Sequence, residues 1–107
     1  MRVLVIEDEV RLAATLRDLL ELDGYTVDVC HDGESGLDNA LSAIYDVILL
    51  DVMLPKLDGF TVLRRLRAAG DGTPVLMLTA RSEVMIQESL WSLLRQLWKL
   101  KSCTSRE

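Results

Sequence analysis

Acidic and hydroxyl side chains end three short apolar runs of the sequence. Glu7 and Asp8 follow the first run, Asp51 follows the second and Thr79 follows the third. Carboxylates gathered in one place repel one another, so each has a raised pKa unless a cation compensates for the charge. A hard divalent ion such as Mg²⁺ meets this need, because it prefers one or two carboxylates, a backbone carbonyl and water, and it commonly bridges to a phosphate oxygen.

Asp51 has the clearest chemical role within this group. Beside such an ion its carboxylate could act as a nucleophile toward a phosphoryl group, and the Thr79 hydroxyl could donate a hydrogen bond to the new phosphoryl oxygens. A simpler role is open for the first acids: Glu7-Asp8-Glu9 could begin a helix, where negative charge suits the helix dipole. The joint placement of the acids and Thr79 favours the phosphoryl site.

Strands of a parallel sheet, with helices between them, are predicted to position these residues. The predicted strands cover 3–6, 25–30, 47–51 and 74–78, and the predicted helices cover 10–22, 33–44 and 58–69. Continuous apolar runs suit strands that are covered on both faces, whereas the alternating pattern at 25–30 suits an edge strand. The βαβαβαβ order implies right-handed crossovers, so the carboxyl ends of the strands converge at one edge, where open α/β sheets bind ligands.

The composition restricts the class of protein. The chain has 107 residues, half of them hydrophobic, which is enough for one domain with a single core. Its net charge of −5 argues against a nucleic-acid or membrane surface, so any DNA binding is expected in another domain. Cys30 and Cys103 are too few for a disulfide scaffold or a zinc site. No signal peptide or membrane span is expected, and the interpretation is a cytoplasmic protein.

The motifs resemble the receiver domain of two-component response regulators. The resemblance rests on Glu7-Asp8, Asp51, Met53, Pro55, Asp58-Gly59 and Thr79-Ala80 in this order and spacing. It covers residues 1 to about 84, and Leu-Thr-Ala-Arg at 78–81 is most similar to transcription factors of the OmpR/PhoB type. The resemblance implies a flavodoxin-like (CheY-like) doubly wound fold with strand order 2-1-3-4-5.

The same resemblance implies a function in signal transduction. Asp51 would accept a phosphoryl group from a sensor histidine kinase, and Thr79 would be the switch hydroxyl. Mg²⁺ would be bound directly by Asp8 and Asp51, by Glu7 through water, and by the backbone carbonyl of Met53. The domain would be a phosphoacceptor module, in a phosphorelay that regulates transcription, and not an enzyme beyond its own phosphoryl transfer and dephosphorylation.

Further residues receive weaker interpretations. Lys56 and Leu57 lie beside Asp51 in the sequence and could contact the kinase, and the resemblance adds a docking surface on the first helix. Its candidate residues are Arg11, Leu12 and Thr15. His31, the single histidine, follows the predicted edge strand and is expected in a loop far from the acidic cluster. The arginines at 64, 65 and 67 are expected on a solvated helix face.

The sequence departs from the family from Met85 onward. The family's Gly-Ala-Asp turn, fifth strand, Lys-Pro pair and fifth helix are not recognisable, and we divide the chain into a receiver body at 1–84 and an atypical tail at 85–107. Apolar residues fill about half of a helical wheel in this tail, which predicts one amphipathic helix at 83–101. Those residues are Ile86, Leu90, Trp91, Leu93, Leu94, Leu97, Trp98 and Leu100.

The tail raises two questions of function. Lys101 follows Thr79 at the sequence separation at which the family has its phosphate-contacting lysine. A continuous helix would, however, place Lys101 ~28 Å from the strand tips. We therefore do not assign it that role. With no fifth strand or fifth helix, an apolar edge and an uncovered sheet face would be exposed. The tail helix could pack across that face of its own chain, or it could pair with a second copy of the chain. We favour the homodimer, because the tail helix is about half apolar and carries two tryptophans. The predicted contact residues are Leu90, Trp91, Leu94, Leu97 and Trp98.

Two other readings stand beside the phosphoacceptor. The first is a truncated or altered receiver fragment with impaired phosphorylation that acts as a structural dimer through its tail. The second is a phosphohydrolase with an aspartate nucleophile, which is disfavoured because such enzymes have a second acid where Met53 stands. Attachment of the tail to a membrane is disfavoured by Glu88 and by the small number of basic residues.

Overall fold

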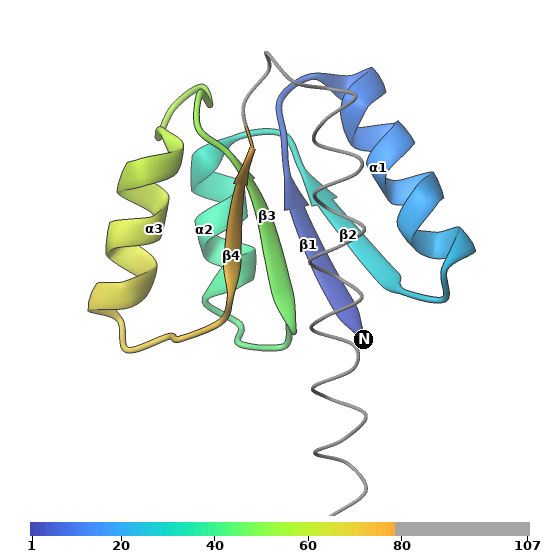
Figure 1. Cartoon of the computed structure of the whole chain (residues 1–107). Coiled ribbons are helices and arrows are strands. Elements are labelled where there is room, and N and C mark those ends of the chain that lie inside the picture. Colours follow the sequence, from blue (N-terminus) through green and yellow to red (C-terminus); the bar gives the residue numbers. More distant parts are fainter. Residues whose placement is uncertain (79–107) are drawn as a thin grey trace, which may run out of the picture.

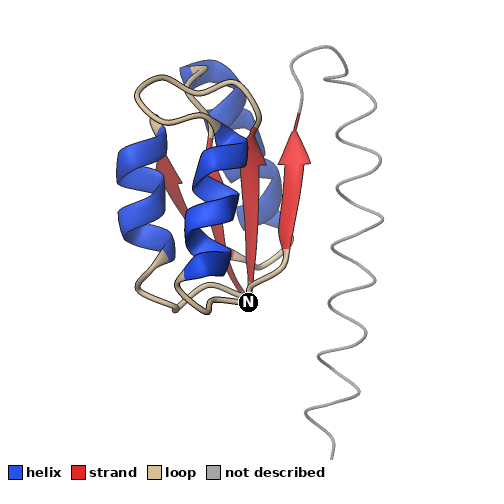
Figure 2. Ribbon diagram, turned by 90° about the vertical axis from the view of Figure 1, so that its left-hand side faces the viewer, coloured by secondary structure: helices blue, strands red, loops and turns tan. Residues whose placement is uncertain are grey.

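The computed structural model describes residues 1–78. Strands and helices alternate in the order β1 (Arg2–Ile6), α1 (Val10–Leu22), β2 (Thr26–Cys30), α2 (Gly33–Ala40), β3 (Val47–Asp51), α3 (Gly59–Ala68) and β4 (Val75–Leu78). The four strands form one parallel sheet in the order β2-β1-β3-β4, and their arrowheads lie at the same end of the sheet in Figures 1 and 2. The predicted CheY-like fold is therefore confirmed for this part of the chain.

Two hydrophobic clusters lie on opposite faces of the sheet. On one face, Leu16 and Leu20 of α1 pack against alternate residues of the strands, including Val5 and Leu49. On the other face, α2 and α3 cover the intervening strand residues, and Figure 1 shows these two helices apart from α1. Because both faces of β1 and β3 are covered, these strands carry apolar residues without alternation.

The register of the sheet brings the strand ends together. Ile6 of β1 is paired with Cys30 of β2 and with Leu50 of β3. Asp51 is paired with Leu78 of β4. The residues directly after Ile6 and Leu50 are therefore neighbours at the carboxyl edge of the sheet. The edge position predicted for β2 is confirmed, and within residues 1–78 β4 forms the other edge.

The predicted helix at 33–44 is wrong at its end. The α2 helix ends at Ala40, and Ile44 lies beyond it with 51% of its surface exposed. The chain turns there because Ala43 has a left-handed backbone (φ 60°) and donates its N–H to Ala40 O at 3.1 Å. The other predicted helices agree with α1 and α3 to within one residue at each end.

Several predictions concern residues outside the described part of the chain. They include the role of Thr79, the placement of Lys101, the tail helix at 83–101, the dimer contacts and the lack of a fifth strand and helix, and they stay predictions. Within residues 1–78, no helix has the length and apolar character needed to cross a membrane.

Candidate functional site

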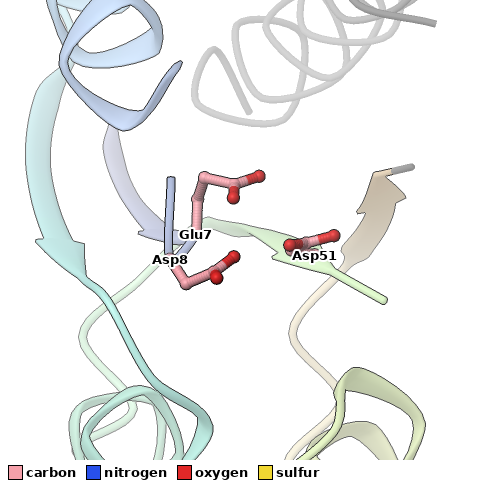
Figure 3. A group of neighbouring side chains, drawn as sticks. All are labelled: Glu7, Asp8 and Asp51. Atoms are coloured by element: carbon pink, nitrogen blue, oxygen red, sulfur yellow. The ribbon is translucent and has the colours of Figure 1, made fainter. Parts of the chain in front are cut away.

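Three carboxylates meet at the carboxyl edge of the sheet. Each of Glu7, Asp8 and Asp51 offers one oxygen, and these three oxygens all lie within 4.8 Å of one another. Glu7 and Asp8 follow β1 and Asp51 ends β3, so the cluster gathers between the two central strands (Figure 3). Glu7 is only 4% exposed and Asp51 only 6%, whereas Asp8 is exposed. The cluster thus has a buried side and a side open to solvent.

The simpler role considered for these acids, capping the first helix, belongs to Glu9. Glu9 is the N-cap of α1, and its carboxylate accepts hydrogen bonds from the N–H groups of Arg11 and Leu12 at 3.3 and 2.7 Å. Glu7 accepts the Glu9 N–H at 2.9 Å with one oxygen. Asp8 is therefore not needed for the cap and remains available to a ligand.

The chain after Asp51 is held by backbone contacts. Val52 donates its N–H to Leu78 O at 3.1 Å, and Gly59 donates its N–H to Val52 O at 2.9 Å. The Met53 N–H donates to Asp51 Oδ1 at 3.3 Å, while the Met53 side chain is 80% exposed. Met53 can therefore contribute to the site through its backbone, although its assignment as a carbonyl ligand stays a prediction.

Two glycines allow a close approach that positions this loop. An ideal Cβ on Gly59 would lie 2.2 Å from Asp51 O, and one on Gly33 would lie 1.9 Å from Leu57 O. Gly33 also donates its N–H to Pro55 O at 3.3 Å. The N-terminus of α2 and that of α3 are thus packed directly against the loop that follows Asp51. The sequence motif contained Asp58-Gly59, but it gave no sign of the contact at Gly33.

Burial and mutual repulsion shift the acids away from their ordinary protonation. Burial, together with the smaller effect of the Asp51 charge, raises the pKa of Glu7 from 4.5 to about 7 against the lowering effect of the Glu9 N–H. Burial also raises the pKa of Asp51, with an added contribution from Asp8. The ion pairs of residues 1–78 join Arg2 to Asp28 and Arg17 to Glu21, so neither of them offsets this cluster.

This donor set fits a hard divalent cation. Three carboxylates provide oxygen ligands. Their mutual repulsion destabilises the ionised cluster, and a bound cation would remove it. The exposed side near Asp8 leaves room for water ligands and for a phosphate oxygen. A soft-metal site is not supported, because the cluster contains no histidine or cysteine.

We expect the Mg²⁺-free protein to lose stability as the pH rises from about 5 to about 8. The folded-state pKa of Glu7 is about 7 and its ordinary value is 4.5, so the folded protein keeps a proton that the unfolded chain releases. This contribution is complete below the ordinary pKa and is lost as the pH rises through the folded-state pKa, for a change of ~1–3 kcal/mol in the free energy of unfolding. Urea unfolding in the presence of a chelator measures it.

The controls for this pH dependence are Glu7→Gln and saturating Mg²⁺. Glu7→Gln should reduce the slope of the profile, and the slope that remains comes from Asp51, whose pKa is also raised. Mg²⁺ should flatten the profile because it favours the ionised carboxylates. Four other aspartates have lowered pKa values, and their contribution to the free energy of unfolding is lost only at more acid pH. These residues are Asp28, Asp32, Asp58 and Asp71. A wild-type profile that rises between about pH 5 and pH 8 would contradict the assignment to Glu7.

The prediction that His31 lies far from the acidic cluster is wrong. His31 is exposed and lies in the loop between β2 and α2, as expected, but its Nδ1 is 2.9 Å from the backbone oxygen of Glu7. The register of the two strands explains the difference, because the residue after Cys30 lies beside the residue after Ile6. In the structure the pairing of β1 with β2 continues to their last residues, Ile6 and Cys30.

The residues suggested for kinase contact lie in the loop after β3 and on α1. Lys56 is exposed in the loop after β3 and has a left-handed backbone (φ 66°), and Leu57 is half-buried. On α1, Arg11 and Thr15 are exposed and Leu12 is half-buried against the core. Sequence reasoning missed two exposed apolar residues on helices that begin at the same edge, Val10 and Phe60, which are 62% and 53% exposed.

Comparison with known proteins identifies the family. The profile of the response regulator receiver domain matches residues 3–93. The chain belongs to this family. The transcriptional regulatory protein DltR of Streptococcus agalactiae is 49% identical over 83 residues, which are 78% of this chain and 37% of that protein. This receiver domain thus spans little more than a third of the length of that curated relative.

Solved structures agree with the receiver assignment. The receiver domain of the Francisella response regulator 1452 has 34% identity and a TM-score of 0.72, and the match covers 78% of this chain and 69% of that one. The response regulator TrrA of Thermotoga maritima, solved in complex with Mg²⁺-BeF, has 26% identity and a TM-score of 0.78, with 90% and 97% of the chains covered. The resemblance inferred from the motifs is therefore confirmed.

Proposed function

We propose that this receiver domain accepts a phosphoryl group on Asp51 from the phosphohistidine of a sensor histidine kinase, and that the transfer requires Mg²⁺. Its place in two-component signalling follows from its family. The observation that carries the finer proposal is the carboxylate cluster, whose oxygens lie within 4.8 Å of one another. The Mg²⁺-BeF complex of TrrA is consistent with such a site.

The metal would be held by a small number of oxygen ligands. Asp8 and Asp51 would bind it directly, Glu7 would bind it through water, and Met53 would supply its backbone carbonyl. When bound, Mg²⁺ would neutralise the carboxylates and bind an oxygen of the incoming phosphoryl group. Glu7 and Asp51 have raised pKa values without it, so the ion would also keep the nucleophile ionised.

Asp51 would act as the nucleophile. One of its carboxylate oxygens would attack phosphorus, the P–N bond to the kinase histidine would break, and the imidazole nitrogen would leave with the electron pair of that bond. An acyl phosphate on Asp51 is the product. Attack of water on phosphorus would break the new P–O bond and return the carboxylate and inorganic phosphate. Thr79 is proposed to donate a hydrogen bond to the phosphoryl oxygens.

Phosphorylation by a small acyl phosphate donor tests this function. In the presence of Mg²⁺, the intact mass of the protein should increase by one phosphoryl group, and a chelator should prevent the increase. Asp51→Asn keeps the size of the side chain and removes the nucleophile, so it should show no gain. A gain that persists in Asp51→Asn, or no gain in the wild-type protein, would defeat the proposal.

A homodimer through the tail is the second part of the proposal. Within residues 1–78, β4 lies at an edge of the sheet, and its residues Val75, Leu76 and Met77 are only half-buried. An apolar edge strand is a liability that proteins cover. We propose that the apolar tail residues predicted for dimer contact cover this edge in a homodimer, where the tails of two copies meet. The alternative is a structural dimer of the same kind in which phosphorylation is impaired.

Sedimentation tests the proposed dimer. The wild-type protein should sediment as a dimer, and the double variant Trp91→Ala, Trp98→Ala should shift toward the monomer, because it removes the largest apolar side chains from the predicted contact. A wild-type monomer whose sedimentation the double variant does not change would eliminate the dimer. The phosphorylation experiment then separates the phosphoacceptor from the structural fragment.

A further inference from the structure

The end of β2 holds both backbone polar groups of Glu7. The Glu7 N–H donates to Cys30 O at 2.9 Å, which extends the pairing of β1 with β2 by one residue. The Glu7 carbonyl oxygen lies 2.9 Å from Nδ1 of His31, the next residue along the chain. The backbone segment that carries the first two acids is therefore fixed by two consecutive residues of one neighbouring strand end.

The direction of the His31 hydrogen bond follows from its partner. A carbonyl oxygen can only accept, so Nδ1 of His31 must carry the proton and donate it. The neutral ring with its proton on Nδ1 and the doubly protonated ring both provide this donor. The hydrogen bond can therefore form with either ring, and it holds the Glu7 carbonyl in place.

The Glu7 carbonyl group directly precedes Asp8 and bears on the position of its backbone. β1 ends at Ile6 and α1 begins at Val10, so the acids stand on irregular backbone between two elements. The Glu7 carbonyl and the Asp8 nitrogen belong to one planar peptide unit, so a hydrogen bond to that oxygen orients the start of Asp8. Asp8 is exposed, and burial does little to hold it.

We propose that His31 is a positioning residue for the metal site: its Nδ1–H holds the Glu7–Asp8 peptide so that the Asp8 carboxylate faces Asp51. The inference rests on the proposed function, because it assigns His31 a role in Mg²⁺ binding. His31 does not touch the metal or the phosphoryl group in this account. Its effect is on the affinity for Mg²⁺, and the chemistry at saturating Mg²⁺ is unchanged.

The test compares His31→Ala with His31→Asn in Mg²⁺ titrations by calorimetry. Alanine removes the donor, and we expect the Kd for Mg²⁺ to rise roughly three- to ten-fold, the loss that one hydrogen bond accounts for. Asparagine places its amide nitrogen as many bonds from Cα as Nδ1, so it can donate to the same oxygen. His31→Asn should therefore restore an affinity close to that of the wild-type protein.

Two further measurements separate positioning from general damage. Ser42→Ala removes a side-chain hydrogen bond to the Asn39 carbonyl beyond the far end of α2, and it should leave the Kd unchanged. In the phosphorylation assay, His31→Ala should shift the half-saturating Mg²⁺ concentration but reach the wild-type extent, whereas partial unfolding would lower the extent.

Each outcome decides the proposal. Equal Mg²⁺ affinity of His31→Ala and the wild-type protein would overturn the role of His31 and leave the proposed function standing. Equal loss in His31→Ala and His31→Asn would show that the donor is not the cause, and would also overturn it. A wild-type protein that does not bind Mg²⁺ would overturn both the role of His31 and the metal-dependent function.

Discussion

Replacing Asp8 by asparagine is expected to weaken Mg²⁺ binding at least about ten-fold. Removing a residue that only hydrogen-bonds to a metal ligand usually lowers metal affinity by at least this factor. Asp8 provides the exposed carboxylate of the cluster, with an oxygen within 4.8 Å of those of Glu7 and Asp51. Asparagine keeps the size of the side chain and an amide oxygen but removes the charge. Phosphorylation of Asp51 at low Mg²⁺ should fall in parallel. Calorimetric titration with Mg²⁺ measures the affinity.

Asp38→Asn is the matched control for Asp8→Asn. Asp38 is exposed on α2, and its substitution changes the net charge of the protein by the same amount. Asp8 is also exposed, so circular dichroism should show that both variants fold. If the two variants bind Mg²⁺ equally well, Asp8 is not a ligand, and the metal site must be built from other groups.

Substituting alanine for Gly59 is expected to lower the free energy of unfolding by about 2–3 kcal/mol, as overpacking of a closely packed site does. The added Cβ would lie 2.2 Å from Asp51 O and 3.0 Å from Val52 Cα. Both obstacles are backbone atoms, so the strain cannot be relieved by rotation of a side chain. The Asp51 backbone must shift, and Mg²⁺ binding should weaken as well. Urea unfolding measures the change in stability.

Gly72→Ala is the control that separates the close contact at Gly59 from the general effect of removing a glycine. A Cβ at Gly72 meets no atom within 4 Å, and the backbone there is not left-handed. Alanine at Gly72 should therefore be neutral or slightly stabilising, because it restricts the unfolded chain. Equal stability of the two variants would show that α3 can move away from β3 without cost, and would contradict the described packing.

Much of the fold was predictable because the central strands carry an unambiguous pattern. The apolar run at 47–50 is buried on both faces. Its length fits a strand and is too short for a helix. The position of Asp51 at the end of this run then follows from chain order alone. The joint location of Glu7 and Asp8 follows in the same way, because parallel strands present their carboxyl ends at one edge.

Features that depend on contacts between distant parts of the chain were not predictable. The roles of Glu7 and Glu9 could not be separated in the sequence, because three consecutive acids fit both a helix cap and a metal site. The end of α2 was missed because Ala43, an ordinary helix former, adopts a left-handed backbone. The contact of His31 with Glu7 joins residues 24 positions apart, and a pattern of neighbouring residues carries no information about it.

The most direct test of the central claim is to locate the phosphoryl group. The protein is treated with an acyl phosphate donor and Mg²⁺, and borohydride then reduces any aspartyl phosphate to homoserine, which peptide mass spectrometry assigns to a position. We predict conversion of Asp51 in the wild-type protein, no conversion when a chelator is present, and no conversion at any position in Asp51→Asn. Conversion at Asp8 or at another carboxylate, with Asp51 unmodified, would contradict the account.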